Sequence, residues 1–165
     1  MNVKDSLIAE FEREAQTTRK HLERLPDDKL NWRPHEKSFT AVGLVSHLVE
    51  MIGWADSILN LDELDIDPAT YKPYEAASVA ELLKTFDDNV AATRKALESV
   101  ADAALDQPWR FKSAGQLFLE RPRGEIFRDI VLSHVTHHRG QFSVYLRLLD
   151  VPVPPSYGPT ADEQD

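Results

Sequence analysis

The sequence contains no cysteine, and this absence excludes two kinds of chemistry. Without thiols the chain has no disulfide bonds and no thiolate ligands, so nitrogen and oxygen atoms must hold any metal ion. A reaction that uses a thiol nucleophile must take that thiol from a substrate. The sequence also lacks an uninterrupted apolar run near the roughly 20 residues that span a bilayer. The N-terminal residues, Met1 to Ser6, do not resemble a signal peptide, so we expect a cytoplasmic protein without a membrane partner.

Basic residues are also scarce relative to acidic ones. The chain has 19 Lys and Arg against 28 Asp and Glu, which gives a net charge of -9. A surface of this sign repels phosphate backbones, so nucleic acids are not expected as partners. A length of 165 residues fits one domain with a sizeable core. We expect that domain over residues 1–150, followed by a proline-rich acidic tail at 151–165.

Apolar side chains recur with helical spacing in the first part of the chain. Residues 5–25 form the first expected helix. The second begins near Ser38 or Thr40, both of which are suitable N-caps, and continues to about Asn60. The prolines within 61–77 indicate a loop.

Two further helices follow this loop. Ser78 and Glu81 have the spacing of a capping box, which predicts the start of a third helix. Residues 104–122 are expected to be irregular or to form a short hairpin, and the fourth helix begins after Pro122. The pattern predicts an all-α protein, a four-helix bundle with this short segment between helices three and four. Bundle cores commonly hold metal sites.

The fourth helix carries the most informative pattern, a cluster of histidines. His134 and His138 are four residues apart, so both lie on one face of the helix. Two imidazoles in this arrangement can bind one divalent ion, as in the His-Glu-x-x-His metalloproteases. Val135 replaces the glutamate of that motif, so the metalloprotease base is absent. His137 is an alternative partner, because residues three apart also share a face.

A third ligand must come from elsewhere in the chain. His47 lies on the apolar side of the second expected helix, and the bundle fold can bring it against His134. Three neutral imidazoles and water make an open site of the catalytic type. The alternative interpretation is that these histidines form hydrogen bonds inside an ordinary core.

Several other residues have simpler interpretations. His21 is expected on the surface, and Arg139 is expected to pair with a surface carboxylate. Glu50 and Asp129 either orient a metal-bound histidine or are solvated. Gly140 interrupts a helix at a cost of about 1 kcal/mol, which suggests close packing against another helix.

Beyond these patterns, the chain resembles the DinB family of bacterial proteins, also called DinB/YfiT-like proteins. The resemblance extends over nearly the whole chain. It is carried by Leu25–Ser38, by His47-Leu48, by His134–Gln141 with its His-x-x-x-His-Arg-Gly-Gln motif, and by Val151–Pro159.

The resemblance implies a four-helix bundle with a three-histidine metal site. Carried over to this sequence, it makes His47, His134 and His138 the ligands and leaves His137 outside. The ion would be divalent, such as Zn, Ni or Fe. Some members of the family are metal-dependent S-transferases or isomerases that use bacillithiol, mycothiol or glutathione, and others are described as hydrolases. The resemblance also makes a homodimer plausible.

We therefore expect a metal-dependent transferase that moves a small thiol to an electrophilic small-molecule substrate. Hydrolysis is the alternative, weakened because the motif contains no built-in general base. A third hypothesis is a non-catalytic metal or small-molecule binding protein of a stress response. Small thiols of this kind are anionic, and Arg123 and Arg139 are candidate anchors for them.

Overall fold

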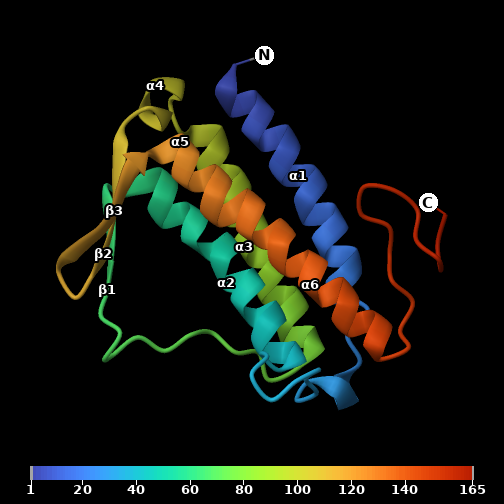
Figure 1. Ribbon diagram of the computed structural model, residues 1–165. Helices are drawn as coiled ribbons and strands as arrows, with labels where there is room; N and C mark the ends of the chain where they lie inside the picture. Colours follow the sequence, from blue (N-terminus) through green and yellow to red (C-terminus); the bar gives the residue numbers. More distant parts are fainter. Residues whose placement is uncertain (1, 165) are drawn as a thin grey trace.

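The computed structural model describes residues 2–164 and is mostly helical, with one small sheet (Figure 1). The elements in chain order are α1 Val3–Leu22, η1 Asp27–Lys29, α2 Ala41–Asn60, β1 Glu63–Ile66, α3 Val79–Ser99, α4 Asp102–Leu105, β2 Pro108–Ser113, β3 Gln116–Pro122, α5 Arg123–Ile126, η2 Phe127–Ser133 and α6 His134–Leu148. The long helices are the four that the sequence pattern predicts, and they form a bundle.

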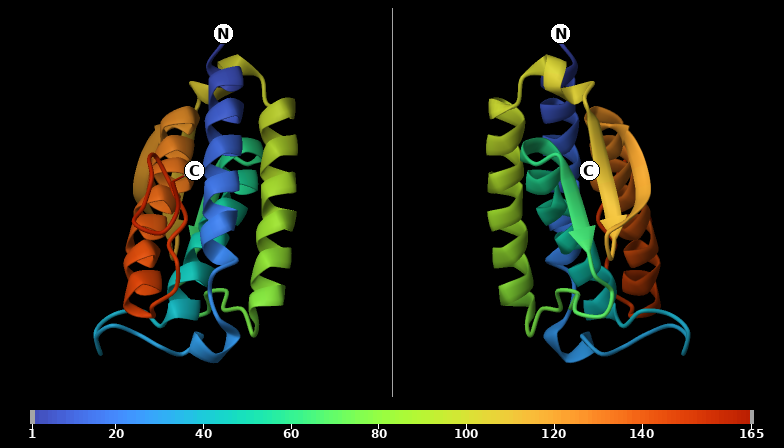
Figure 2. Two further views of the ribbon diagram at one scale, coloured as in Figure 1. Left: turned by 90° about the vertical axis from the view of Figure 1, so that its right-hand side faces the viewer. Right: turned by 90° about the vertical axis from the view of Figure 1, so that its left-hand side faces the viewer.

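In this bundle α2 and α1 lie diagonally opposite each other, and each packs against both α3 and α6 (Figure 2). Helices α2 and α3 run in the same direction, opposite to α1 and α6 (Figure 1). Parallel neighbours need a long connection. Residues 61–78 supply it, leaving α2 at the sheet and returning along the molecule to the start of α3.

The helix starts agree with the cap residues that the sequence predicts. Thr40 caps α2, and its Oγ1 accepts a hydrogen bond from the Gly43 N–H at 3.0 Å. Ser78 caps α3, and its Oγ accepts from the Glu81 N–H at 3.1 Å. The Glu81 carboxylate accepts from the Ala77 N–H rather than from that of Ser78, so the capping box is closed one residue earlier than expected.

The small sheet corrects the prediction of an all-α bundle. The expected hairpin between helices three and four is present as β2 and β3, which pair antiparallel. The segment predicted to be a loop contains β1, which pairs parallel with β2. Leu64 and Ile66 alternate with acidic residues there, a strand pattern too short to outweigh the nearby prolines. The partner strand lies more than 40 residues further along the chain, so local patterns do not reveal the pairing.

The fourth predicted helix is continuous, but its hydrogen-bonding pattern changes along its length from α to π and back to α. Residues Phe127–Ser133 form a π-helix, in which the His134 N–H donates to the carbonyl of Asp129, five residues earlier. Such wide turns are uncommon and occur frequently at functional sites. This one ends where the histidine cluster begins.

Helix α2 is the one helix within residues 2–164 that is long and apolar enough to cross a membrane, with a mean hydropathy of 1.3. Of that apolar window, 61% is buried inside the protein. His47, Glu50 and Asp56 also interrupt it. These are the properties of a core helix in a soluble domain, so the segment is weak support for a membrane span.

Candidate metal centre

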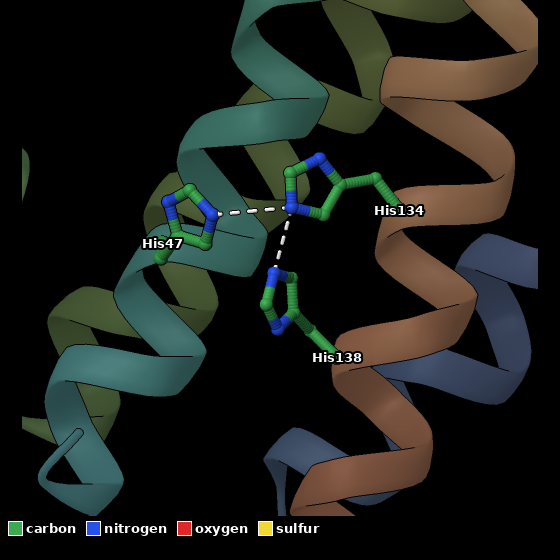
Figure 3. Close-up of side chains that lie close together, drawn as sticks. All are labelled: His47, His134 and His138. Atoms are coloured by element: carbon green, nitrogen blue, oxygen red, sulfur yellow. Dashed lines mark hydrogen bonds between the residues drawn. The ribbon is translucent and has the colours of Figure 1, made fainter. Parts of the chain in front are cut away.

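Three histidines from two helices converge between α2 and α6 (Figure 3). His134 Nε2 lies 3.3 Å from His47 Nε2 and 2.7 Å from His138 Nε2. One nitrogen from each residue falls in a group that spans no more than 4.8 Å. The structure therefore brings together the three histidines selected from the sequence. His137 is exposed and lies outside the cluster.

This donor set fits a divalent metal ion. Metal–nitrogen bonds of about 2.0–2.1 Å in a tetrahedral site place neighbouring ligand nitrogens roughly 3.3 Å apart. The His47–His134 separation matches that value, and the His134–His138 pair needs only a small outward movement. Three imidazoles leave at least one coordination position for water or another ligand. The cluster could thus hold a metal ion in an open site, with a coordination position free for another ligand.

Gln141 fixes the tautomer of His138. Its side-chain oxygen lies 2.7 Å from His138 Nδ1. Because an amide oxygen only accepts, Nδ1 carries the proton and the Nε2 lone pair faces the other histidines. A hydrogen bond of this kind is typical behind a metal-bound histidine. The sequence analysis assigned Gln141 no such role, although its position three residues after His138 placed it on the same face.

The surroundings of the cluster favour neutral imidazoles. Desolvation is the main cause, and the nearby His138 and His47 add to it, so that the pKa of His134 is lowered to about 4. Burial also lowers the pKa of His47 and His138. Neutral imidazole is the form that binds metal, so the three side chains are ready to act as ligands near pH 7.

A cavity of about 870 Å³ opens beside the cluster, with His47 and His134 in its wall. It is bounded by α2, by the connection between β1 and α3, by the sheet and by η2. Trp54 and Phe111 stand together in its wall, with ring centroids 5.6 Å apart. A smaller cavity of about 450 Å³ reaches His138 from the other side, and Phe39 lines both. The histidines are therefore accessible to small molecules.

Comparison with known proteins identifies the fold family. The model of the DinB superfamily matches residues 10–142. This chain belongs to the DinB superfamily. Two relatives from Bacillus subtilis (strain 168) show the same likeness over most of their length. YrdA is 29% identical over 160 residues, covering 96% of this chain and 90% of YrdA. YjoA is 24% identical over 144 residues, covering 87% and 88%. Neither name states an activity.

Solved DinB-like structures share the whole fold. One from Bacillus cereus ATCC 10987 aligns with a TM-score of 0.73 at 19% identity, covering 93% of this chain and 97% of that one. The structure of YjoA aligns with a TM-score of 0.68 at 20% identity, covering 92% and 96%. At such identities the likeness supports the fold alone.

Two arginines proposed as anchors for a thiol are not available in this DinB protein. Arg139 is only 2% exposed and forms an ion pair of 2.7 Å with Glu14, instead of pairing with a surface carboxylate. Arg123 is also buried and donates to the backbone carbonyls of Ile58 and Leu61. Both predictions were wrong because the residues stabilise contacts between elements that are distant in sequence.

Three other interpretations of single residues change as well. His21 is fully buried, with Nδ1 2.9 Å from the carbonyl of Thr17, whereas the sequence suggested a surface position. No atom of another element lies within 4 Å of a Cβ placed on Gly140, so close packing does not explain that glycine. Asp129 pairs with Arg121 at 2.6 Å and does not orient a histidine.

Proposed function

We propose that this protein is a metal-dependent enzyme in which His47, His134 and His138 hold one divalent ion at the end of the large cavity. The observation that supports the proposal is a cluster of three neutral imidazoles, two of which, His47 and His134, lie in the wall of a space large enough for a small molecule. The donor set suits Zn, Ni or Fe. When bound there, such an ion would lower the pKa of a thiol and supply a thiolate at neutral pH.

The reaction we propose is transfer of a small thiol to an electrophilic carbon. The chain lacks cysteine, so the nucleophile comes from a second substrate. The sulfur donates an electron pair to form the new S–C bond, the leaving group departs with its own pair, and the thiol proton passes to solvent. The protein would contribute to catalysis by binding and orienting the acceptor against the apolar walls of the cavity, which also exclude water.

Metal-dependent hydrolysis remains a second candidate because of Glu50. This carboxylate lines the same cavity as His47 and lies three residues further along α2, about one turn away. The histidine motif alone contains no general base. Glutamate is one of the residue types that act as the general base in hydrolases, so Glu50 could take this role. A protein that binds metal and ligand without turnover is the third outcome of the tests below.

The metal site is tested by elemental analysis of the purified protein. We expect about one divalent ion per chain, with loss in His47→Ala, His134→Ala and His138→Ala. His137→Ala is the matched control, because this exposed neighbour lies on the same helix outside the cluster. Full metal content in His138→Ala, together with loss in His137→Ala, would reverse the assignment.

The reaction is tested with bacillithiol, mycothiol, glutathione and coenzyme A against chloro-nitroaromatic, epoxide and maleylpyruvate acceptors. Thiol consumption should require metal, stop on chelation, return when metal is restored, and be absent in His134→Ala. Metal-loaded protein that hydrolyses esters or amides without thiol, and loses this activity in Glu50→Gln, would favour hydrolysis. Absence of turnover together with tight ligand binding would favour the binding protein.

A further inference from the structure

The large cavity has a charge pattern of its own. Its walls are mainly aromatic and aliphatic, and the charged residues among them are two carboxylates, Glu50 and Glu75. Among residues 2–164 no lysine or arginine lines it. This pattern is unfavourable for an anionic acceptor, and it favours an acceptor with a positive charge.

Glu50 stands between the histidines and the aromatic wall. Along α2, His47, Glu50 and Trp54 follow one another at helical spacing and all line the cavity. A ligand that fills this cavity from the aromatic wall to the histidines therefore lies beside the carboxylate. Its apolar part would lie near Trp54, Phe111 and Phe118, where the last two rings meet edge to face at 5.9 Å.

The Glu50 carboxylate is held in place by neutral donors. Its Oε1 accepts hydrogen bonds from the Tyr71 hydroxyl and, at 3.3 Å, from the Tyr74 N–H. Partial burial, and then the bond to Glu50, raise the pKa of Tyr71 well above its ordinary value of 10.0, so the phenol stays a donor. Both donors come from the connection between β1 and α3, which covers this side of the cavity.

The Glu50 carboxylate has no ion-pair partner in the part of the chain that the structure describes. Across residues 2–164 no lysine, arginine or histidine forms an ion pair with Glu50, although the chain contains many ion pairs elsewhere. Its Oε2 accepts no hydrogen bond from this part of the chain. A half-buried carboxylate gains most from a cation that displaces its remaining water.

We propose that the cavity binds a small molecule with a protonated amine on an aromatic skeleton. The ammonium group lies against Glu50, and the ring lies against the wall that Trp54 and Phe111 form, where aromatic faces also attract cations. The claim that this amine is the acceptor substrate rests on the proposed function. The binding itself needs no metal.

The test uses three probes of one shape and different charge, which are 2-phenylethylamine, 2-phenylethanol and 3-phenylpropionate. Isothermal titration calorimetry on the full chain, with and without a chelator, measures each Kd. We expect the amine to bind about tenfold or more tightly than the alcohol, and the carboxylate most weakly, because a charge-assisted hydrogen bond is worth about this factor. Equal affinity for amine and alcohol, or tightest binding of the carboxylate, would overturn the proposal.

Two variants locate the effect. Glu50→Gln should lower the affinity for the amine about tenfold while changing that for the alcohol less than about twofold. Asp56→Asn is the matched control, an exposed carboxylate on the same helix outside the cavity, and should bind like wild type. If Glu50→Gln does not fold, Glu75→Gln and Trp54→Leu give a second measurement, and we expect a smaller loss of amine affinity in each. Unchanged amine affinity in every variant that folds contradicts the proposal.

The outcomes separate this inference from the proposed function. Amine binding in chelated protein without thiol turnover would contradict the enzyme and leave the amine site standing. Turnover with neutral acceptors, together with no preference for the amine, would contradict the amine site alone.

Discussion

Two consecutive residues of α6, His138 and Arg139, point to different sides of the helix and have different surroundings. His138 points toward α2 and lines the smaller cavity, and its Nε2 lies next to another imidazole nitrogen, that of His134 (Figure 3). Arg139 points toward α1 and the C-terminal segment. There it pairs with Glu14, donates to Thr18 Oγ1 at 3.1 Å and donates to the Tyr157 hydroxyl at 2.8 Å.

The comparison teaches how to separate a functional polar cluster from a structural one. Around Arg139 a buried cation meets a carboxylate, a hydroxyl and a phenol, so its charge and donors are matched within the protein. Around His138 three similar bases face one another, and at most one shared proton per pair can join them. A cluster of imidazole nitrogens with more acceptors than donors is a poor structural contact and a good ligand set.

The largest expected effect on stability comes from removing the buried ion pair between Arg139 and Glu14. Arg139→Met should lower the free energy of unfolding by about 3–5 kcal/mol, because it leaves the Glu14 carboxylate without its partner. Chemical denaturation followed by circular dichroism measures this. The control is Arg147→Met on the same helix, whose ion pair with Asp162 lies at the surface and is screened by solvent, so a much smaller loss is expected. Equal losses in both variants would contradict the contrast.

Binding of a divalent ion to the histidine cluster should increase the stability of the protein. The apo protein should be folded, because the core is large, and a divalent ion at 100 times its Kd should add about 2.7 kcal/mol by mass action. Thermal denaturation with and without metal checks this in wild type and His134→Ala, where the gain should disappear. An apo protein without helical circular dichroism at pH 7 would show that the metal is required for folding.

A smaller effect is expected from acid in the chelated protein. Above pH 6.5 the histidines are neutral in both states. Between pH 6.5 and about 4 the unfolded chain takes up a proton that native His134, with its pKa lowered to about 4, excludes. The free energy of unfolding should therefore decrease as pH falls through this window. His134→Asn should show a smaller decrease in Tm than wild type, and identical pH profiles would argue against the shifted pKa.

The smallest expected effect on stability comes from a substitution at Gly140 of α6. Gly140 is exposed within the helix, and a Cβ there meets no other element. Gly140→Ala should stabilise the protein by about 0.5–1 kcal/mol, because alanine restricts the unfolded chain and favours the helix. The metal content should not change. A loss of stability would reveal a contact that the geometry does not contain.

The sequence was most informative where the pattern is local. The Thr40 and Ser78 caps, the four long helices and the shared face of His134 and His138 all follow from spacings within one turn. The selection of His47 needed the bundle fold, since this residue lies 87 positions before His134.

The errors arose where the decisive partner is distant in sequence. Arg139 looked like a surface residue because Glu14 and Tyr157 are far away in the chain and reach it only in the folded protein. Strand β1 was missed because its partner β2 follows a whole helix later. The cavity also joins several elements, so nothing in the local pattern predicted its acidic and aromatic lining.

The separation of His47 from His134 also fixes when the centre can exist during synthesis. The two residues meet only after α3, the sheet and the π-helical segment have been made, and α6 is the last helix of the chain. A ribosome-bound fragment that ends before α6 carries one of the three ligands. Metal therefore cannot nucleate folding of the first helices, and closing this long loop must be driven by apolar packing. An ion bound by all three histidines would therefore enter only after α6 has packed against α2.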